Sequence, residues 1–293
     1  MLLDFEKIDQ IKRLVIIALF SDDYLMDNLV LKGGNAIDLI YKISSRASFD
    51  LDFSISGQFG KNQIDEIEQR IENTLKETFR ESGYKVFDLN FKEKPKNLPE
   101  SLVDFWGGYS LDFKFIENDK FDKFKHSLES LRRNAIALGS STKCEIDISK
   151  FEYCESKQAR DLEGYTIYVY SPDMIVFEKL RSICQQMPEY KDIVQSTHPK
   201  ARAKDFFDIY TIFKNFSIDL ESESNRSLLK GIFGIKKVPI SWIGKIKDHK
   251  SYHEKDFVSV KDTIKAGERI EDFEVYFDFV VNKFDTLKVL WEE

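Results

Sequence analysis

The spacing of apolar residues changes its period several times along the first 170 residues. Over residues 48–55, apolar and polar side chains alternate strictly, with Leu51 and Phe53 on one face and Asp50 and Asp52 on the other. This period of two is typical of a half-buried strand. The remaining patterns predict helices at residues 4–27, 35–43, 62–82 and 120–138, and strands at residues 29–31, 84–91, 109–116, 143–151 and 165–170.

A helical pattern takes over after Tyr170. Ser171 is suited to cap a helix, Pro172 to occupy its first position and Asp173 to lie in its first turn, so we expect a helix to about residue 187. Helical spacing continues to residue 290. We therefore expect an α/β (α+β) fold: a mixed sheet flanked by helices in residues 1–170, followed by a mainly helical C-terminal domain in residues 171–293.

Composition narrows the class of protein. Of the 293 residues, 42% are hydrophobic, and 25 Phe and 12 Tyr supply material for a large core, which favours a globular chain. The longest apolar run, residues 14–20, is shorter than the ~18–20 residues of a membrane span, and acidic residues stand where a signal peptide would be basic. The three cysteines form no C-x-x-C pair, which argues against a zinc site. We expect a cytoplasmic protein without a membrane partner.

Charge is distributed unevenly. The chain has 44 Lys+Arg and 51 Asp+Glu, a net charge of −7, which excludes a uniformly basic coat for nucleic acid. Residues 179–250 nevertheless carry an excess of six positive charges. Such a distribution can attract cations in one region and phosphates in another. Within the basic region, the lysine-rich run at residues 236–250 with Trp242 is open to two interpretations, an RNA contact or a solvated helix face packed by the ring.

Two short motifs have residue types that suit phosphate and metal chemistry. Gly33 and Gly34 lie between a predicted strand and a predicted helix, where backbone N–H groups can approach an anion; an ordinary tight turn is the alternative. Asp50 and Asp52 are two positions apart on a predicted strand, roughly 6–7 Å at Cα and on one face. Mg²⁺ suits such a pair, and a solvent-facing acidic stripe is the alternative.

The order of these motifs resembles the nucleotidyltransferase signature of the AbiEii/AbiGii toxin family. Residues 31–36 (LKGGNA) and 46–53 (RASFDLDF) match its glycine and Asp-x-Asp segments, with Asn35 where the family usually has Thr or Ser. Residues 173–180 (DMIVFEKL) resemble its Lys-Leu helix, and residues 200–210 (KARAKDFFDIY) its Arg-Asp-x-x-Asp-Leu-Tyr element.

The resemblance implies a set of site residues. It implies that Asp50, Asp52 and a third carboxylate bind two Mg²⁺ ions; Asp147, in an alternating run, is the candidate, and Asp112 is the alternative. It also implies that Asp205 is an active-site residue, although Asp205 and Asp208 could instead be structural acids bonded to neighbouring Arg or Lys. The nucleotide-binding candidates are Lys32, Gly33, Gly34, Asn35, Arg46, Ser48 and Lys179.

We therefore predict a nucleotidyltransferase that moves a nucleoside monophosphate from a nucleoside triphosphate (NTP) to a hydroxyl of an RNA acceptor, with tRNA as the leading candidate. The resemblance implies a toxin with a cognate antitoxin protein. One alternative keeps the chemistry but transfers to a protein side chain or a small molecule. Another is a nucleotide-binding module without catalysis, and the paired charges of Asp50 and Asp52 weigh against it.

Overall fold

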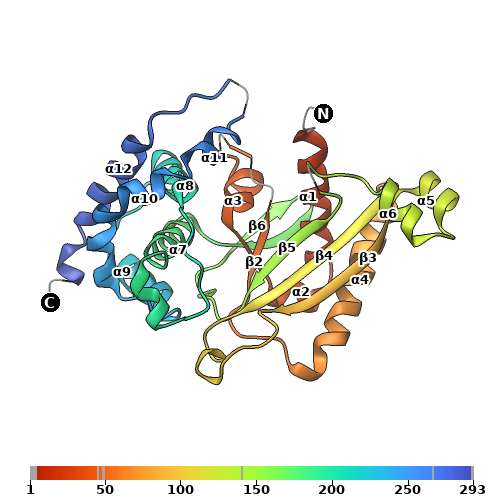
Figure 1. Ribbon diagram of the computed structural model, residues 1–293, viewed down its shortest axis with the longest axis horizontal. Helices are drawn as coiled ribbons and strands as arrows, with labels where there is room; N and C mark the ends of the chain where they lie inside the picture. The colour runs from red at the N-terminus through yellow and green to blue at the C-terminus, as the bar shows by residue number, and fades with distance from the viewer. Residues whose placement is uncertain (1–4, 45, 48–49, 140, 266, 292–293) are drawn as a thin grey trace. The chain divides into compact units, whose positions relative to one another are not determined.

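A computed structural model describes residues 5–44, 46–47, 50–139, 141–265 and 267–291 (Figure 1). The chain forms two units, one of Met1–Asn35 with Phe49–Val169 and the other of Ala36–Ser48 with Tyr170–Glu293. The backbone therefore passes from the first unit to the second and back before the sheet is complete. Residues 36–48, which the sequence analysis placed in the first domain, group with the second unit, and the domain boundaries proposed there stay a prediction.

The first unit contains a seven-stranded mixed sheet with the strand order β3-β4-β5-β2-β1-β7-β6. β2 is antiparallel to β1 but parallel to β5, and β1 is parallel to β7. The expected mixed sheet flanked by helices is confirmed. Its strands are β1 Val30–Lys32, β2 Leu51–Ser54, β3 Tyr84–Lys94, β4 Gly108–Glu117, β5 Cys144–Ser149, β6 Gln158–Leu162 and β7 Tyr165–Val169.

Short helices replace two of the predicted long ones in this unit. The helix expected at residues 4–27 is divided at Asp22, whose side chain accepts a hydrogen bond from the Leu25 amide at 2.9 Å and caps a new helix. The helix expected at residues 120–138 is divided in the same way at Ser127. The helices of the unit are α1 Phe5–Phe20, α2 Asp23–Asn28, α3 Gly33–Asn35, α4 Ile64–Glu81, α5 Asn118–Phe124 and α6 Leu128–Asn134, with 3-10 turns at Lys61–Gln63 and Glu100–Leu102.

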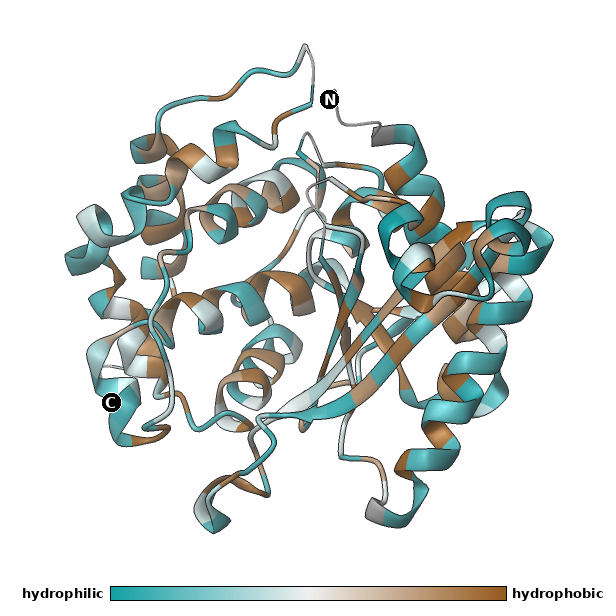
Figure 2. Cartoon of the chain, turned by 45° about the vertical axis from the view of Figure 1, so that its right-hand side comes forward, coloured by the Kyte–Doolittle hydropathy of each residue, from teal (hydrophilic) through white to brown (hydrophobic). Residues whose placement is uncertain are grey.

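The sheet has one apolar face and one polar face. α4 buries one side chain per turn against the apolar face, and its Phe79 ring meets Phe113 and Phe115 of β4 at 5.5 and 5.4 Å between ring centroids. α1 covers the same face through Phe20, which meets Phe53 of β2 at 6.2 Å. Figure 2 shows apolar and polar residues following one another along the strands. We call the opposite side, which carries Asp52, Ser110 and Asp147, the polar face.

The second unit is helical. The Ser171 hydroxyl accepts a hydrogen bond from the Met174 amide at 3.2 Å and caps α7, as its sequence predicts. The helix predicted at residues 35–43 is instead the three-residue α3 followed by a π-helix. The elements of the unit are this π-helix (Ala36–Ile40), α7 Pro172–Cys184, α8 Ala203–Asn215, α9 Glu223–Gly234, α10 Lys250–Glu254, α11 Phe257–Lys261 and α12 Phe273–Asp285, with 3-10 turns at Pro188–Asp192, Ile240–His249 and Lys288–Leu290.

Aromatic rings join α8 to α12 in the core of the second unit. Phe206 stacks on Phe277 at 5.3 Å, and Tyr210 meets Tyr276 edge to face at 5.1 Å. These pairs contribute beyond the area that they bury. Within the described ranges, no helix has the length and apolar character needed to cross a bilayer.

Candidate active site

The turn after β1 brings the backbone close to a carboxylate. Gly33 has φ of +71°, and a Cβ added to it would stand 2.8 Å from Oδ2 of Asp52. Both the left-handed backbone and the lack of space require glycine at this position. The turn that the sequence analysis assigned to phosphate binding therefore packs directly against the second residue of the Asp-x-Asp motif.

Strand register places two carboxylates side by side. Asp52 of β2 pairs with Asp147 of the parallel strand β5, and residues paired in this way share a face of the sheet. Neighbouring strands are about 4.8 Å apart, so the two side chains leave the sheet next to each other. Asp112, the alternative third carboxylate, is opposite Glu145 in a different row; it binds Lys143 at 2.9 Å. The register therefore favours Asp147 over Asp112.

Asp147 has a cationic partner that the sequence analysis missed. Nζ of Lys94 lies 2.9 and 3.3 Å from the two carboxylate oxygens of Asp147. The side chains of Lys94 and Asp147 are 61% and 54% exposed. The strand predicted for residues 84–91 ends too early, because β3 continues to Lys94. Extending the predicted strand by three residues would have included Lys94 and placed it on the polar face.

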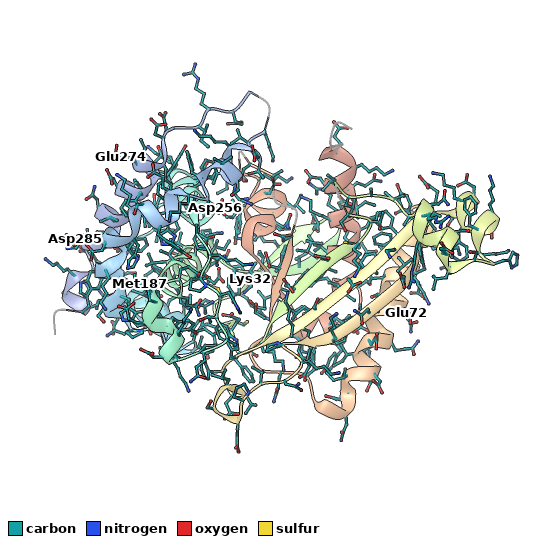
Figure 3. All side chains as sticks on the ribbon, in the orientation of Figure 1. Lys32, Glu72, Met187, Asp256, Glu274 and Asp285 are labelled. Atoms are coloured by element: carbon teal, nitrogen blue, oxygen red, sulfur yellow. The ribbon has the colours of Figure 1, made fainter. Side chains whose placement is uncertain are left out.

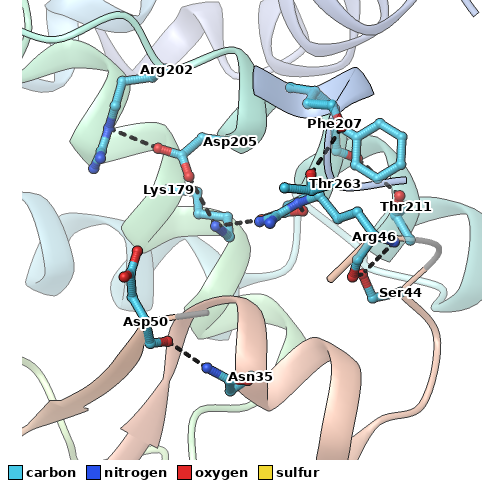
Figure 4. A network of polar contacts seen from close by, with 12 residues as sticks. Asn35, Ser44, Arg46, Asp50, Lys179, Arg202, Asp205, Phe207, Thr211 and Thr263 are labelled. Carbon is cyan, nitrogen blue, oxygen red and sulfur yellow. Dashed lines mark hydrogen bonds and ion pairs between the residues drawn. The ribbon is translucent and has the colours of Figure 1, made fainter. Parts of the chain in front are cut away.

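Asn35 holds the beginning of the Asp-x-Asp motif through a buried side chain. Its amide nitrogen donates to the backbone carbonyl of Asp50, and its amide oxygen accepts from Lys12 at 3.2 Å (Figure 4). Asn35 is fully buried, whereas Asp50 is exposed just before β2. The side chain of Asn35 is thus directed at its own chain and positions the backbone of Asp50.

The remaining candidates of the first unit differ in accessibility. Lys32, on β1 (Figure 3), is buried and donates to Ser149 Oγ at 3.0 Å, with Glu152 at 3.7 Å. Its charge is therefore already opposed by Glu152. Gly34 lies in the helical turn α3. Ser48 lies outside the described residues, so its predicted nucleotide contact stays a prediction.

The donor set fits a metal that is completed by substrate. The described part of the chain contains no group of three or more His, Cys, Asp or Glu side chains already arranged around one point. Asp52 and Asp147 nevertheless give two neighbouring carboxylates, and the ammonium group of Lys94 marks a position beside them where positive charge is accepted. Mg²⁺ is commonly held by one or two carboxylates together with substrate phosphates.

A buried ion network organises the candidates of the second unit. Nζ of Lys179, on α7, lies 2.9 Å from Asp205 and 2.7 Å from Asp208, both on α8. Arg46 binds the two oxygens of Asp208 at 2.7 and 2.5 Å, and Arg202 lies 2.9 Å from Asp205 (Figure 4). Three cations thus share two carboxylates, which leaves one excess positive charge.

The network shifts the protonation of its members. Burial alone would raise the pKa of Asp208, but Arg46 and Lys179 outweigh burial and lower it to about 2. Burial alone would lower the pKa of Lys179, but Asp205 and Asp208 outweigh burial and raise this pKa above its usual value. All three groups are therefore charged at neutral pH. The contacts agree with the structural interpretation of Asp205 and Asp208; the nucleotide roles of Arg46 and Lys179 and the active-site role of Asp205 stay predictions.

Two further side chains of the second unit, those of His253 and Trp242, are buried. His253 is buried, and its Nδ1 accepts a hydrogen bond from the Arg202 amide at 3.2 Å; burial lowers its pKa to about 4. Trp242 is also buried and meets Tyr190 edge to face at 6.3 Å, while Lys245 binds Glu189 at 3.1 Å. The Trp242 ring therefore packs the helix and is not presented for stacking on a base.

Replacing Asn35 by alanine should destabilise the first unit. The variant removes the donor to the Asp50 carbonyl and one acceptor of Lys12, and we expect a loss of about 1–3 kcal/mol in the free energy of unfolding. Urea denaturation followed by circular dichroism measures this loss. Asn134→Ala, which removes an exposed amide on α6, is the control and should stay within about 0.5 kcal/mol of the wild type. Equal effects of both variants would contradict the positioning role.

Asp208→Asn should destabilise the second unit in a pH-dependent way. It leaves Arg46 and Lys179 with one carboxylate, so we expect a loss of about 3–5 kcal/mol at pH 7. Because the pKa of Asp208 is lowered on folding, its contribution is present above the unfolded value and is lost as pH falls from about 4 towards about 2.

Thermal and urea unfolding of the wild type and of Asp208→Asn are measured across this pH range. The difference between their free energies of unfolding should shrink at low pH. Asp278→Asn, which removes an exposed partner of Lys250 in the same unit, is the control. A difference that is constant down to pH 2 would contradict the assignment.

Three solved structures are similar to this chain along most of its length. Two Helicobacter pylori proteins have related structures: a candidate nucleotidyltransferase with 16% identity and a TM-score of 0.49 over 97% of this chain and 96% of that one, and JHP933 with 15% identity and a TM-score of 0.49 over 98% and 96%. An antigenic nucleotidyltransferase-like protein of Paracoccidioides brasiliensis has 13% identity and a TM-score of 0.36 over 89% and 95%. These likenesses are too low to bear on function, and the curated proteins include no match.

The family comparison is decisive. The model of the family described as "Nucleotidyl transferase AbiEii toxin, Type IV TA system" matches residues 16–278, which include every segment of the proposed signature. The expectation of an enzyme of the nucleotidyltransferase class is thereby confirmed. The chain belongs to the AbiEii nucleotidyl transferase toxin family of type IV toxin–antitoxin systems.

Proposed function

We propose that this protein transfers a nucleoside monophosphate from an NTP to a hydroxyl of an RNA acceptor, in a reaction that depends on Mg²⁺. tRNA is the acceptor that we favour, and a cognate antitoxin would counter the activity in the cell. The observation that carries the proposal is the pairing of Asp52 with Asp147 beside the turn at Gly33. Family membership supports the nucleotide chemistry but does not name the acceptor.

Electrostatics support a divalent cation at this pair. Two carboxylates on adjacent strands repel each other, and Lys94 places one positive charge beside Asp147. Asp50, Asp52 and Asp147 would hold the metal, and Asp50 is exposed just before β2. When bound, Mg²⁺ would neutralise the negative charge that develops on phosphate oxygens during transfer.

The residues of the first unit suggest how the reaction is arranged. Gly33 lets the turn after β1 pack against the Asp52 carboxylate, and Asn35 fixes the position from which Asp50 projects. The acceptor oxygen forms a bond to the α-phosphorus, the bond from that phosphorus to the β-bridging oxygen breaks, and pyrophosphate leaves. An aspartate of the set accepts the proton of the attacking hydroxyl.

In the second unit, the excess positive charge of the network suits a phosphate-binding role for Lys179 and Arg46. That role rests on the family resemblance, since Lys179 is buried and already contacts two carboxylates. The net charge of −7 and the packed Trp242 weigh against tight non-specific binding of RNA. A selective and transient acceptor contact is the form of recognition that these charges favour.

Asp52→Ala should abolish transfer. The experiment incubates purified protein with Mg²⁺, each labelled NTP in turn, and total tRNA or total protein. We expect label in tRNA with the wild type and a decrease of at least roughly 100-fold with Asp52→Ala, because loss of a ligand should exceed the effect of losing an outer-shell partner. Asp104→Ala, which removes an exposed carboxylate of the same unit, should retain activity.

Label in protein instead of tRNA would contradict the RNA acceptor. Expression in a susceptible host tests the toxin role separately: the wild type should arrest growth, Asp52→Ala should not, and a harmless but active wild type would contradict that role.

Gly33→Ala tests the closeness of the turn to Asp52. The new methyl group would displace the Asp52 carboxylate, so we expect a loss of transfer comparable to that of Asp52→Ala, with the protein still folded by circular dichroism. Gly57→Ala is the matched control, because a Cβ there meets nothing within 4 Å. Full activity of Gly33→Ala would show that the position of Asp52 is not critical.

A further inference from the structure

The row of residues that contains the carboxylate pair continues across the polar face to the edge of the sheet. Asp147 of β5 is opposite Ser110 of β4, which is in turn opposite Lys92 of β3. Lys94 follows two residues after Lys92 and therefore shares its face. The polar face thus changes from acidic at its centre to basic at the β3 edge.

Lys92 and Lys94 are the lysines of this face that can accept a new partner. Lys114 is held by Asp88 at 3.0 Å and Lys143 by Asp112 at 2.9 Å. Lys92 is exposed and forms no ion pair with any residue that the structure describes. The partner of Lys94 is the exposed Asp147, and exposed ion pairs add little stability because water screens them. Lys94 can therefore exchange Asp147 for a phosphate at small cost.

Between these lysines and the carboxylates, β4 presents small residues. Ser110 and Gly108 are opposite Lys92 and Lys94 on β4. Gly108 cannot be larger, because an added Cβ would stand 2.4 Å from the Ile148 carbonyl oxygen. No bulky side chain of β4 rises between the basic edge and Asp147. An extended anionic strand can therefore run from the edge to the carboxylates in contact with both.

We propose that Lys92 and Lys94 bind the phosphodiester backbone of the RNA acceptor and direct its reactive hydroxyl towards Asp147. This inference rests on the proposed function and adds the side from which the acceptor approaches. Phosphate contacts of this kind position a strand without reading its bases. The two lysines place positive charge on the β4 side of the Asp52–Asp147 pair, whereas the glycine turn lies on the β1 side.

The test is RNA binding without catalysis. Fluorescence anisotropy of labelled total tRNA is measured in metal-free buffer between 50 and 200 mM salt, for Lys92→Gln, Lys94→Gln and the double variant. Each lost contact should lower the slope of log affinity against log salt by roughly 0.7, and the double variant by about twice that. Lys92→Arg and Lys94→Arg should keep the wild-type slope.

The control is Lys76→Gln on α4, the helix that covers the apolar face. Lys76 binds Glu72 at 2.7 Å, and Figure 3 labels Glu72 on that helix. The variant makes the same change of charge away from the polar face and should leave the slope unchanged. A second titration with a labelled non-hydrolysable NTP should give the same affinity for the wild type and the Lys92 and Lys94 variants.

The outcomes separate this inference from the proposed function. A wild type without salt-dependent tRNA binding would contradict the RNA acceptor itself. A wild type that binds tRNA, with glutamine variants no different from Lys76→Gln, would overturn the subsite alone. Loss of NTP affinity with unchanged tRNA binding would assign the two lysines to the triphosphate and would also overturn it.

Discussion

The parallel pairing of β2 with β5 is the constraint on which the candidate site depends. It places Asp52 beside Asp147, although like charges on neighbouring strands destabilise a sheet. The apolar faces of the same strands offset this repulsion, since Phe53 and Ile148 are buried where the carboxylates are not. The sheet thus holds two negative charges together by packing on its other side, and the proposed chemistry would use an arrangement that the polar face alone would not maintain.

In the second unit, charges of opposite sign are in contact. Its buried charges need opposite charges close by, and Asp208 contacts both Arg46 and Lys179. A buried ion pair is weak evidence for stability, because desolvation offsets much of the attraction. The network does specify one arrangement, since its contacts form only when α7, α8 and Arg46 are correctly placed.

Local patterns predicted the elements of the site well, and tertiary partners account for what they did not predict. Alternation in residues 48–55 and 143–151 was sufficient to place Asp52 and Asp147 on strands, and the cap at Ser171 marked the start of α7. The burial of Lys32 and Lys179 depends on residues more than 20 positions away, which periodicity does not record. Lys94 was missed because the apolar signal of β3 fades before the strand ends.

The crossing of the chain between the units has a consequence for biosynthesis. Arg46 leaves the ribosome 162 positions before Asp208, its partner in the buried network. At roughly 5–20 residues per second, this interval lasts about 10–30 s, during which residues 36–48 have no network to join. A nascent chain already has both glycines and both motif aspartates early in translation. The second unit nevertheless cannot fold until the C-terminal half is made, so a prematurely terminated product has the glycine turn and the Asp-x-Asp motif without the buried network.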